Sequence, residues 1–196
     1  MNQSTAVTLW RLLVAACAFT GVALAAQQYA VWWTALSQLA SLAVGIAYLG
    51  LAVAEPRSPW LRGALASTML LVALAFIPMN NDNLWDPFSV FEHMLTPALV
   101  VLDFVLVGAN QARVRWWHPV TWLVPSAAYL AWYVLGGLDT YHLLDVDRPA
   151  ALAANATVLA ALLLAVGLVL YDVGRRRRPV PVPADLEPAR EPVLTG

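Results

Sequence analysis

Six long apolar stretches constrain the fold of this chain more than any other feature of its sequence. Each is close to the roughly 20 residues that cross the hydrocarbon core of a bilayer. They run over about 9–26, 31–54, 60–78, 88–108, 119–138 and 150–173. Of the 196 residues, 61% are hydrophobic and 12% are charged, whereas soluble domains have about 45–50% and about 25%. The sequence therefore predicts an all-α, polytopic membrane protein, with a six-helix transmembrane bundle over residues 1–174.

The arginines predict which ends of these helices face the cytoplasm. With one exception, Arg148, the arginines in and around the spans fall on one side of the predicted bundle: Arg11, Arg57, Arg62, Arg113, Arg115 and the run 175–178. The positive-inside rule then places both termini in the cytoplasm and the connections 27–30, 79–87 and 139–149 outside. Lysine is absent and Ala, Leu and Val abound. We take this as a sign of a bacterial source, and so expect a bacterial cell-membrane protein.

The two ends of the chain need separate interpretation. Val22-Ala23-Leu24-Ala25 resembles a signal cleavage site, and the residues before Cys17 resemble a lipobox. Because Arg11 interrupts the approach to Cys17 and the apolar run is long for a signal core, we expect a retained helix, with cleavage as the alternative. Residues 175–196 begin with four arginines and continue as a proline-rich segment, which predicts a disordered cytoplasmic tail anchored at anionic headgroups.

The fourth predicted span carries three ionisable residues, Glu92, His93 and Asp103. Such groups cost roughly 2.5–3.5 kcal/mol each on insertion scales, so they usually face a polar cavity. Asp103 lies about 15 Å from His93 along the helix, which excludes a direct His–Asp pair. We expect Glu92 near the interface, in contact with water, and a structural role for Asp103 in hydrogen bonds to Tyr or Trp side chains of the fifth span. Pro97 removes the helical partner of the His93 carbonyl, which favours a kink and a polar pocket.

A polar stripe on the second predicted span offers partners for His93. Thr34, Ser37, Gln38 and Ser41 recur at spacings of three and four. Many such stripes only pack helix against helix through hydrogen bonds. Thr34 is nevertheless predicted at the depth of His93, because both follow an outward connection by a few residues. A hydroxyl beside an imidazole is the minimal arrangement for a nucleophile and its general base, so a packing role and a catalytic role both stay open.

Several short motifs resemble those of the androgen-induced and androgen-dependent TFPI-regulating protein family, and its bacterial branch of six-span proteins in particular. The resemblance covers about residues 10–171. It rests on Thr34, His93 with its following proline, Asp103, Trp122-Leu123-Val124-Pro125 with Tyr129, and Tyr141-His142-Leu143-Leu144-Asp145.

The resemblance implies a function and a site. Animal members of that family are threonine hydrolases of fatty acid esters of hydroxy fatty acids. Their threonine nucleophile and histidine align with Thr34 and His93. A lipid ester in the membrane is then the expected substrate, with neutral His93 as the base. The candidate supporting residues are Ser37, Gln38, Asp103, Tyr141 and Asp145, of which Asp145 either orients His93 or caps a turn.

Other classes of protein make different predictions. A proton-linked transporter would depend on Asp103 and His93, and a non-catalytic structural or assembly factor would depend on neither. A haem would need axial histidines paired across helices, whereas His118 and His142 fall outside the spans. We expect neither a cofactor nor a metal. The net charge of -1 argues against nucleic acid as a partner, and the oligomeric state is left open.

Overall fold

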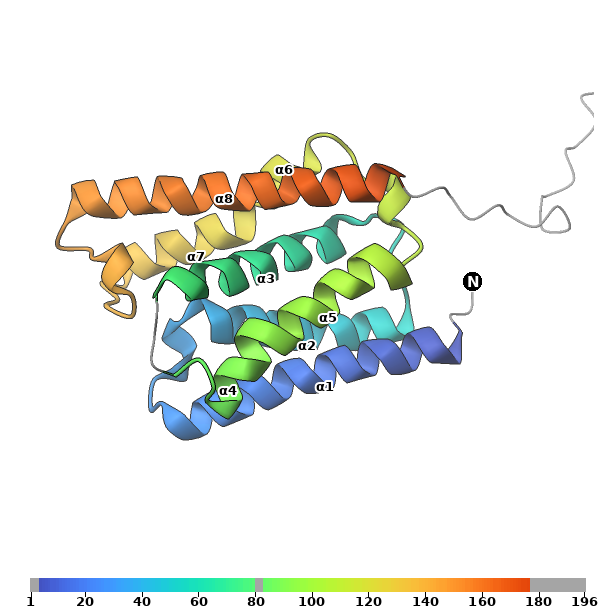
Figure 1. The fold of residues 1–196 in the computed structure, drawn as a ribbon, viewed down its shortest axis with the longest axis horizontal. Coiled ribbons are helices and arrows are strands. Elements are labelled where there is room, and N and C mark those ends of the chain that lie inside the picture. Colours follow the sequence, from blue (N-terminus) through green and yellow to red (C-terminus); the bar gives the residue numbers. More distant parts are fainter. Residues whose placement is uncertain (1–3, 80–82, 177–196) are drawn as a thin grey trace, which may run out of the picture.

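The computed structural model describes residues 4–79 and 83–176, and all regular structure in these ranges is helical (Figure 1). The α-helices are α1 (Thr5–Gln28), α2 (Leu36–Val53), α3 (Trp60–Met79), α4 (Pro87–Val90), α5 (Thr96–Leu102), α6 (His118–Thr121), α7 (Val124–Leu135) and α8 (Pro149–Arg176). Short 3₁₀ turns are η1 (Trp32–Thr34), η4 (Gln111–Arg113) and η5 (His142–Leu144), and two π-helical turns are η2 (Phe91–Leu95) and η3 (Asp103–Val107).

The prediction of an all-helical chain is confirmed, and its helices fit a membrane protein. Four helical stretches are long and apolar enough to cross a bilayer: Thr5–Gln28, Leu36–Val53, Pro87–Val107 and Pro149–Arg176. The apolar part of α3 is shorter, Trp60–Phe76, and α7 has 12 residues. The count of six spans therefore stays a prediction. Of the predicted tail, Arg175 and Arg176 form the last turn of α8, and residues 177–196 lie outside the described residues.

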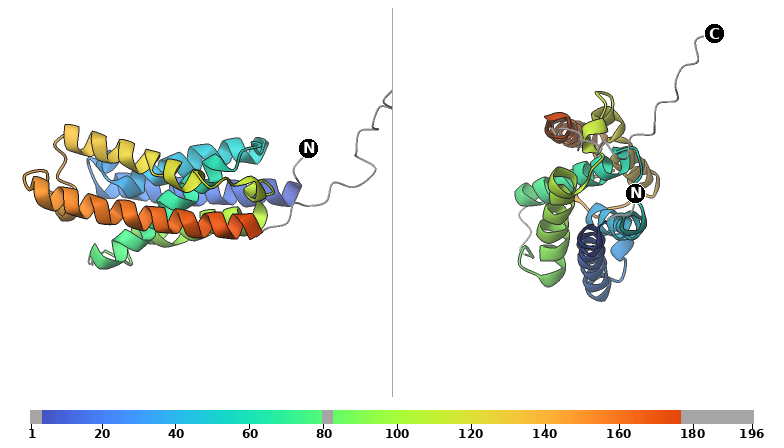
Figure 2. Two further views of the ribbon diagram at one scale, coloured as in Figure 1. Left: turned by 90° about the horizontal axis from the view of Figure 1, so that it is seen from above. Right: turned by 90° about the vertical axis from the view of Figure 1, so that its right-hand side faces the viewer.

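The helices lie side by side along the long axis of the molecule (Figures 1 and 2). Helices α1 and α2 pack against each other, and α3 contacts α2, α5, α7 and α8. Small side chains allow close approach: Ala15 and Ala18 of α1 share one apolar core with Ala40 and Val44 of α2. The start of α1 and the end of α8 lie at the same end of the bundle (Figure 1).

The fourth apolar stretch is a helix interrupted by the two π-helical turns. In η2 the Thr96 N–H donates to the Phe91 carbonyl, five residues earlier, in place of the usual four. Pro97 follows at once, and its ring crowds the carbonyl of His93, four residues before it. The irregularity expected at Pro97 takes the form of this wider turn. Single π turns of this kind often occur at functional sites.

Candidate functional site

A cavity of about 510 Å³ lies where α1 ends and α8 begins. Its wall is mostly apolar, with a few polar side chains, as is usual for small-molecule sites. The polar or hydrogen-bonding residues that line it include Thr34, Ser37, Gln38, Asn83, His93, Ser126, Tyr129, Thr140 and Tyr141. We call this region the cavity end. The structure thus brings Thr34, His93, Ser37, Gln38 and Tyr141 together, whereas Asp103 and Asp145 do not line the cavity.

His93 enters the cavity from the π-helical turn η2. Its ring stacks on Phe76 of α3, with centroids 3.8 Å apart and planes at 15°. The backbone of Val72 forms a hydrogen bond with the imidazole, and among the described residues Nδ1 has no partner. We assign the Val72 bond to Nε2 on this basis. An imidazole held by a carbonyl on one nitrogen presents the lone pair of the other, as a general base requires.

Thr34 ends the 3₁₀ turn η1, and two tyrosines hold the main chain of Thr34 and of Leu36. The Tyr129 hydroxyl donates to the Thr34 carbonyl at 2.7 Å, and the Leu36 N–H donates to the Tyr141 hydroxyl at 2.8 Å. The Thr34 hydroxyl itself donates to the Val31 carbonyl at 3.1 Å. Helix α2 has no side-chain cap at Ala35, so the Tyr141 hydroxyl takes over part of the capping role.

Tyr141 lies in the connection between α7 and α8, where it is fixed from both sides. Its own N–H donates to the Tyr133 hydroxyl at 3.0 Å. Burial raises the pKa of Tyr141 to about 12, so the phenol keeps its proton at neutral pH. The aromatic cluster of Tyr129, Tyr133 and Tyr141 thereby holds η1 and the start of α2 in one place.

Glu92 is not near water as predicted, since its exposed fraction is 0%. Gln38 Nε2 donates to Glu92 Oε2 at 3.0 Å, and the Ser37 hydroxyl forms a second hydrogen bond with the carboxyl group. Helix α1 closes the other side, because a Cβ on Gly21 would meet the Glu92 Cγ at 3.0 Å. The predicted polar stripe on α2 thus has two members bonded to Glu92, and both also line the cavity.

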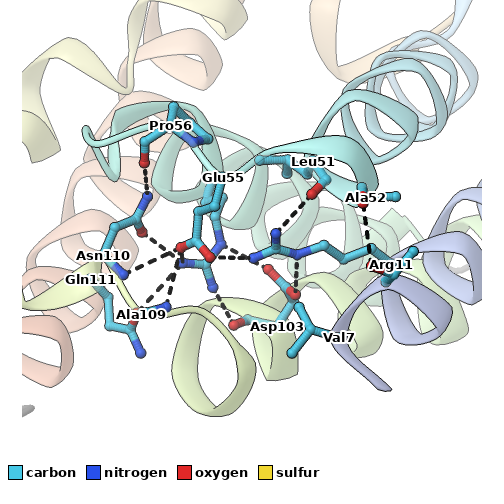
Figure 3. A network of polar contacts seen from close by, with 12 residues as sticks. Val7, Arg11, Leu51, Ala52, Glu55, Pro56, Asp103, Ala109, Asn110 and Gln111 are labelled. Carbon is cyan, nitrogen blue, oxygen red and sulfur yellow. Dashed lines mark hydrogen bonds and ion pairs between the residues drawn. The ribbon is translucent and has the colours of Figure 1, made fainter. Parts of the chain in front are cut away.

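Asp103 lies in a separate polar cluster, which Figure 3 shows from close by. This cluster includes Arg11, near the start of α1, and so lies at the other end of the bundle. The charged partners of Asp103 are two arginines: Arg62 Nε lies 2.8 Å from Oδ2 and Arg11 Nε 3.5 Å from Oδ1. A tyrosine also lies against Asp103, but this is Tyr48 of α2 and not one of the predicted Tyr or Trp side chains of the fifth span. Glu55 joins both arginines, at 2.7 Å from Arg11 and 3.1 Å from Arg62. Arg62 also donates to the Asp103 carbonyl and, at 2.7 Å, to Asn110 Oδ1. We call these residues the arginine network.

The arginine network is tightly packed as well as charged. The side chains of Arg11, Arg62 and Asp103 have exposed fractions of 0%. A Cβ on Gly108 would overlap the Arg62 guanidinium, so this position requires glycine. The sequence had indicated Arg11 and Arg62 only as markers of topology and had not indicated Glu55. Their common signal is weak: two arginines and two carboxylates whose predicted depths match at one end of four different spans.

Asp145 caps a turn in the connection between α7 and α8. Its Oδ1 accepts the Asp147 N–H at 2.9 Å, and its Oδ2 pairs with the exposed Arg148 at 3.2 Å. Of its two predicted roles, only turn capping is supported by these contacts. A cavity residue that the sequence reading missed is Ser126 of α7, whose buried hydroxyl has no partner among the described residues. The only signal for it is its place one turn before Tyr129.

No protein-family model matches this chain, and no curated protein or solved structure matches it. The site is therefore interpreted from its own chemistry. Among the residues that the structure describes, no group of three or more His, Cys, Asp or Glu side chains could hold a metal ion. The cavity combines hydroxyl groups, one imidazole with a free lone pair and an apolar wall. These groups suit acyl transfer on an apolar substrate.

Proposed function

We propose that this chain is a six-span integral membrane hydrolase that cleaves lipid esters, with Thr34 as nucleophile and His93 as general base. The observation that carries the proposal is that Thr34 and His93, from segments far apart in the sequence, line one largely apolar cavity. The resemblance to the androgen-induced and androgen-dependent TFPI-regulating protein family supports the same two residues in the same two roles.

The proposed reaction begins with a rotation of the Thr34 side chain. In the free protein its hydroxyl donates to the Val31 carbonyl, and it must turn toward His93 to react. Hydrogen bonds of this kind often form only once a substrate is bound. Nδ1 of His93 then takes the hydroxyl proton while Oγ1 attacks the ester carbonyl. The same proton passes to the departing alcohol, and water hydrolyses the acyl-threonine with His93 again as base.

Three features support positioning for this chemistry. Tyr129 holds the Thr34 main chain, and Phe76 with Val72 holds the imidazole ring. Because a misplacement of about 1 Å can cost about 100-fold in rate, such fixed placement matters. The apolar wall, with Leu159 and Leu163 of α8, suits an acyl chain. With both termini in the cytoplasm, the cavity end would face the outer side of the cell membrane.

The arginine network argues against a proton-linked transporter, the alternative from another class. Such a carrier would use Asp103 together with His93. Asp103 does not line the cavity, and its carboxylate already faces two arginines. Asp103 therefore cannot act together with His93 on a solute in the cavity. A non-catalytic structural or assembly role is left as an outcome of the experiment below.

The experiment compares fluorophosphonate labelling and turnover of a long-chain fatty acyl ester in purified variants. Wild type and Ser126→Ala should be labelled, and Thr34→Ala should not, since only Thr34 is the proposed nucleophile. Turnover should fall by at least about 10³-fold in Thr34→Ala and His93→Gln. Asp145→Asn, a turn residue outside the cavity, controls for general damage.

The possible outcomes distinguish Thr34 from Ser126 as the nucleophile, and a hydrolase from a non-catalytic protein. If labelling were lost in Ser126→Ala but kept in Thr34→Ala, the nucleophile would be Ser126 and not Thr34. A folded wild type that is neither labelled nor active on long-chain esters would sink the hydrolase proposal and leave the non-catalytic role.

A further inference from the structure

Glu92 is a buried carboxyl group without a counter-charge. Its exposed fraction is 0%, and it lies inside the bundle between α1 and α2. Among the residues that the structure describes, no arginine or histidine forms an ion pair with it. Its hydrogen-bond partners, Gln38 and Ser37, are neutral. An ionised carboxylate in such a place is strongly unfavourable, and the group is expected to neutralise itself.

The hydrogen-bond inventory of the Glu92–Gln38 pair shows where a proton belongs. Gln38 Nε2 donates to Glu92 Oε2 at 3.0 Å. The other oxygen of each group, Glu92 Oε1 and Gln38 Oε1, is buried and has no partner within the described residues. An amide oxygen and an ionised carboxylate oxygen are both acceptors, so they cannot bond to each other. A single proton on Glu92 Oε1 would make it a donor, and a bond from it to Gln38 Oε1 would satisfy both atoms.

We propose that Glu92 and Gln38 form a neutral acid–amide pair that binds one proton and ties η2 to α2 behind the cavity wall. The pair has two hydrogen bonds, Gln38 Nε2–H to Glu92 Oε2 and Glu92 Oε1–H to Gln38 Oε1. This site goes beyond the proposed function, because it needs neither a substrate nor turnover. Since Ser37 and Gln38 line the cavity, release of the proton places a negative charge directly behind that wall.

Other titratable groups lie near the pair and must be separated from it. His93 follows Glu92 in the same turn, and the Tyr141 hydroxyl is close enough for the charge of Glu92 to act on it. On α1, Cys17 lies one turn before Gly21. On α2 the facing side chains, Ser37, Gln38 and Ser41, do not titrate. A measurement that reports carboxyl groups alone is therefore needed.

Infrared spectroscopy of the purified protein in detergent supplies that measurement. At neutral pH the difference spectrum of wild type minus Glu92→Gln should contain the C=O stretch of a protonated carboxyl, shifted in D₂O. In wild type alone this band should bleach as the pH is raised. Absence of the band at neutral pH overturns the proposal. If Glu92→Gln fails to fold, the bleaching of the wild-type band still decides the matter. In folded Gln38→Met the band should persist at a shifted frequency, because its hydrogen-bond partner is gone.

Thermal unfolding as a function of pH tests whether the protonated pair stabilises the contact between η2 and α2. A folded state that retains a proton which the unfolded chain releases loses stability as pH rises. The unfolding midpoint of wild type should fall toward alkaline pH relative to Glu92→Gln, whose amide keeps both hydrogen bonds without a proton. Asp145→Asn should follow wild type. If the unfolding midpoints of wild type and Glu92→Gln changed in parallel with pH, the proposed link between η2 and α2 would be wrong. None of these readouts depends on whether Thr34 is a nucleophile.

Discussion

The two ends of the interrupted helix from Pro87 to Val107 bury one carboxyl group each, and they do so in opposite ways. Asp103, in η3, lies against Arg11 and Arg62, within 3.5 Å and 2.8 Å. Glu92, in η2, lies against an amide and a hydroxyl. Both have exposed fractions of 0%. Equal burial therefore says nothing about charge, because the neighbours decide whether a carboxyl group is ionised.

The difference also separates structure from chemistry within the bundle. The arginine network links α1, α3 and η3 through charges that compensate one another, with two arginines and two carboxylates. Its residues do not line the cavity. At the cavity end, His93 and Ser126 keep polar atoms that have no partner among the described residues. Unused hydrogen-bonding capacity beside a cavity is where binding and catalysis are expected.

The largest expected effect is that of removing the charge of Asp103. Asp103→Asn leaves the two buried arginines with Glu55 as their one carboxylate partner within the described ranges, so the free energy of unfolding should fall by about 3–5 kcal/mol. Glu92→Gln should cost far less, because it replaces one neutral group by another. Unfolding both variants by SDS titration in mild detergent checks the contrast, and a greater loss in Glu92→Gln than in Asp103→Asn would reverse it.

Acid should weaken the arginine network, which is the opposite of the dependence proposed for Glu92. Burial raises the pKa of Glu55, but the hydrogen bond from Arg11 and the charge of Arg62 outweigh it and leave the pKa below its ordinary value. A lowered folded-state pKa adds stability above the unfolded value, and that stability is lost as pH falls. Glu55→Gln should therefore be less stable than wild type at neutral pH, by less than Asp103→Asn. The gap should close in acid, whereas a gap that widens in acid would contradict the pairing.

Loss of the Tyr129 hydroxyl should affect the cavity end alone. Tyr129→Phe removes the donor to the Thr34 carbonyl, at a cost of about 1 kcal/mol in unfolding free energy. If Thr34 is the nucleophile, turnover should fall by about 10-fold to 100-fold. Tyr171→Phe, on α8 at the opposite end, is the matched control. Equal turnover in both variants would show that the Tyr129 hydroxyl does not position Thr34.

The smallest effect is expected in the connection between α7 and α8. In Asp145→Asn the new side chain can still accept the Asp147 N–H, and only the pairing with exposed Arg148 is lost. The free energy of unfolding should change by no more than about 0.5 kcal/mol. A turnover defect in this variant would revive a direct role of Asp145 beside His93.

The sequence predicted the cavity end better than the other end for a physical reason. Thr34 and His93 both follow a connection at one end of their helices, so chain direction alone sets a common depth. Pro97 likewise predicts an irregular helical turn, because proline has no N–H to donate. The partners of Asp103 could not be found in this way. Depth along a helix is readable from spacing, but the rotation of one helix toward another depends on how all of them pack.

The sequence by itself determined that the chain is helical and apolar enough for a membrane, and that three ionisable residues interrupt its fourth apolar stretch. Composition and periodicity suffice for this, because lipid requires every backbone group to be bonded within its helix. Only the tertiary structure decided which of the three faces arginines, which faces an amide and which enters the cavity. That choice rests on side-chain neighbours from α1, α2 and α3, which become neighbours only when the bundle is assembled.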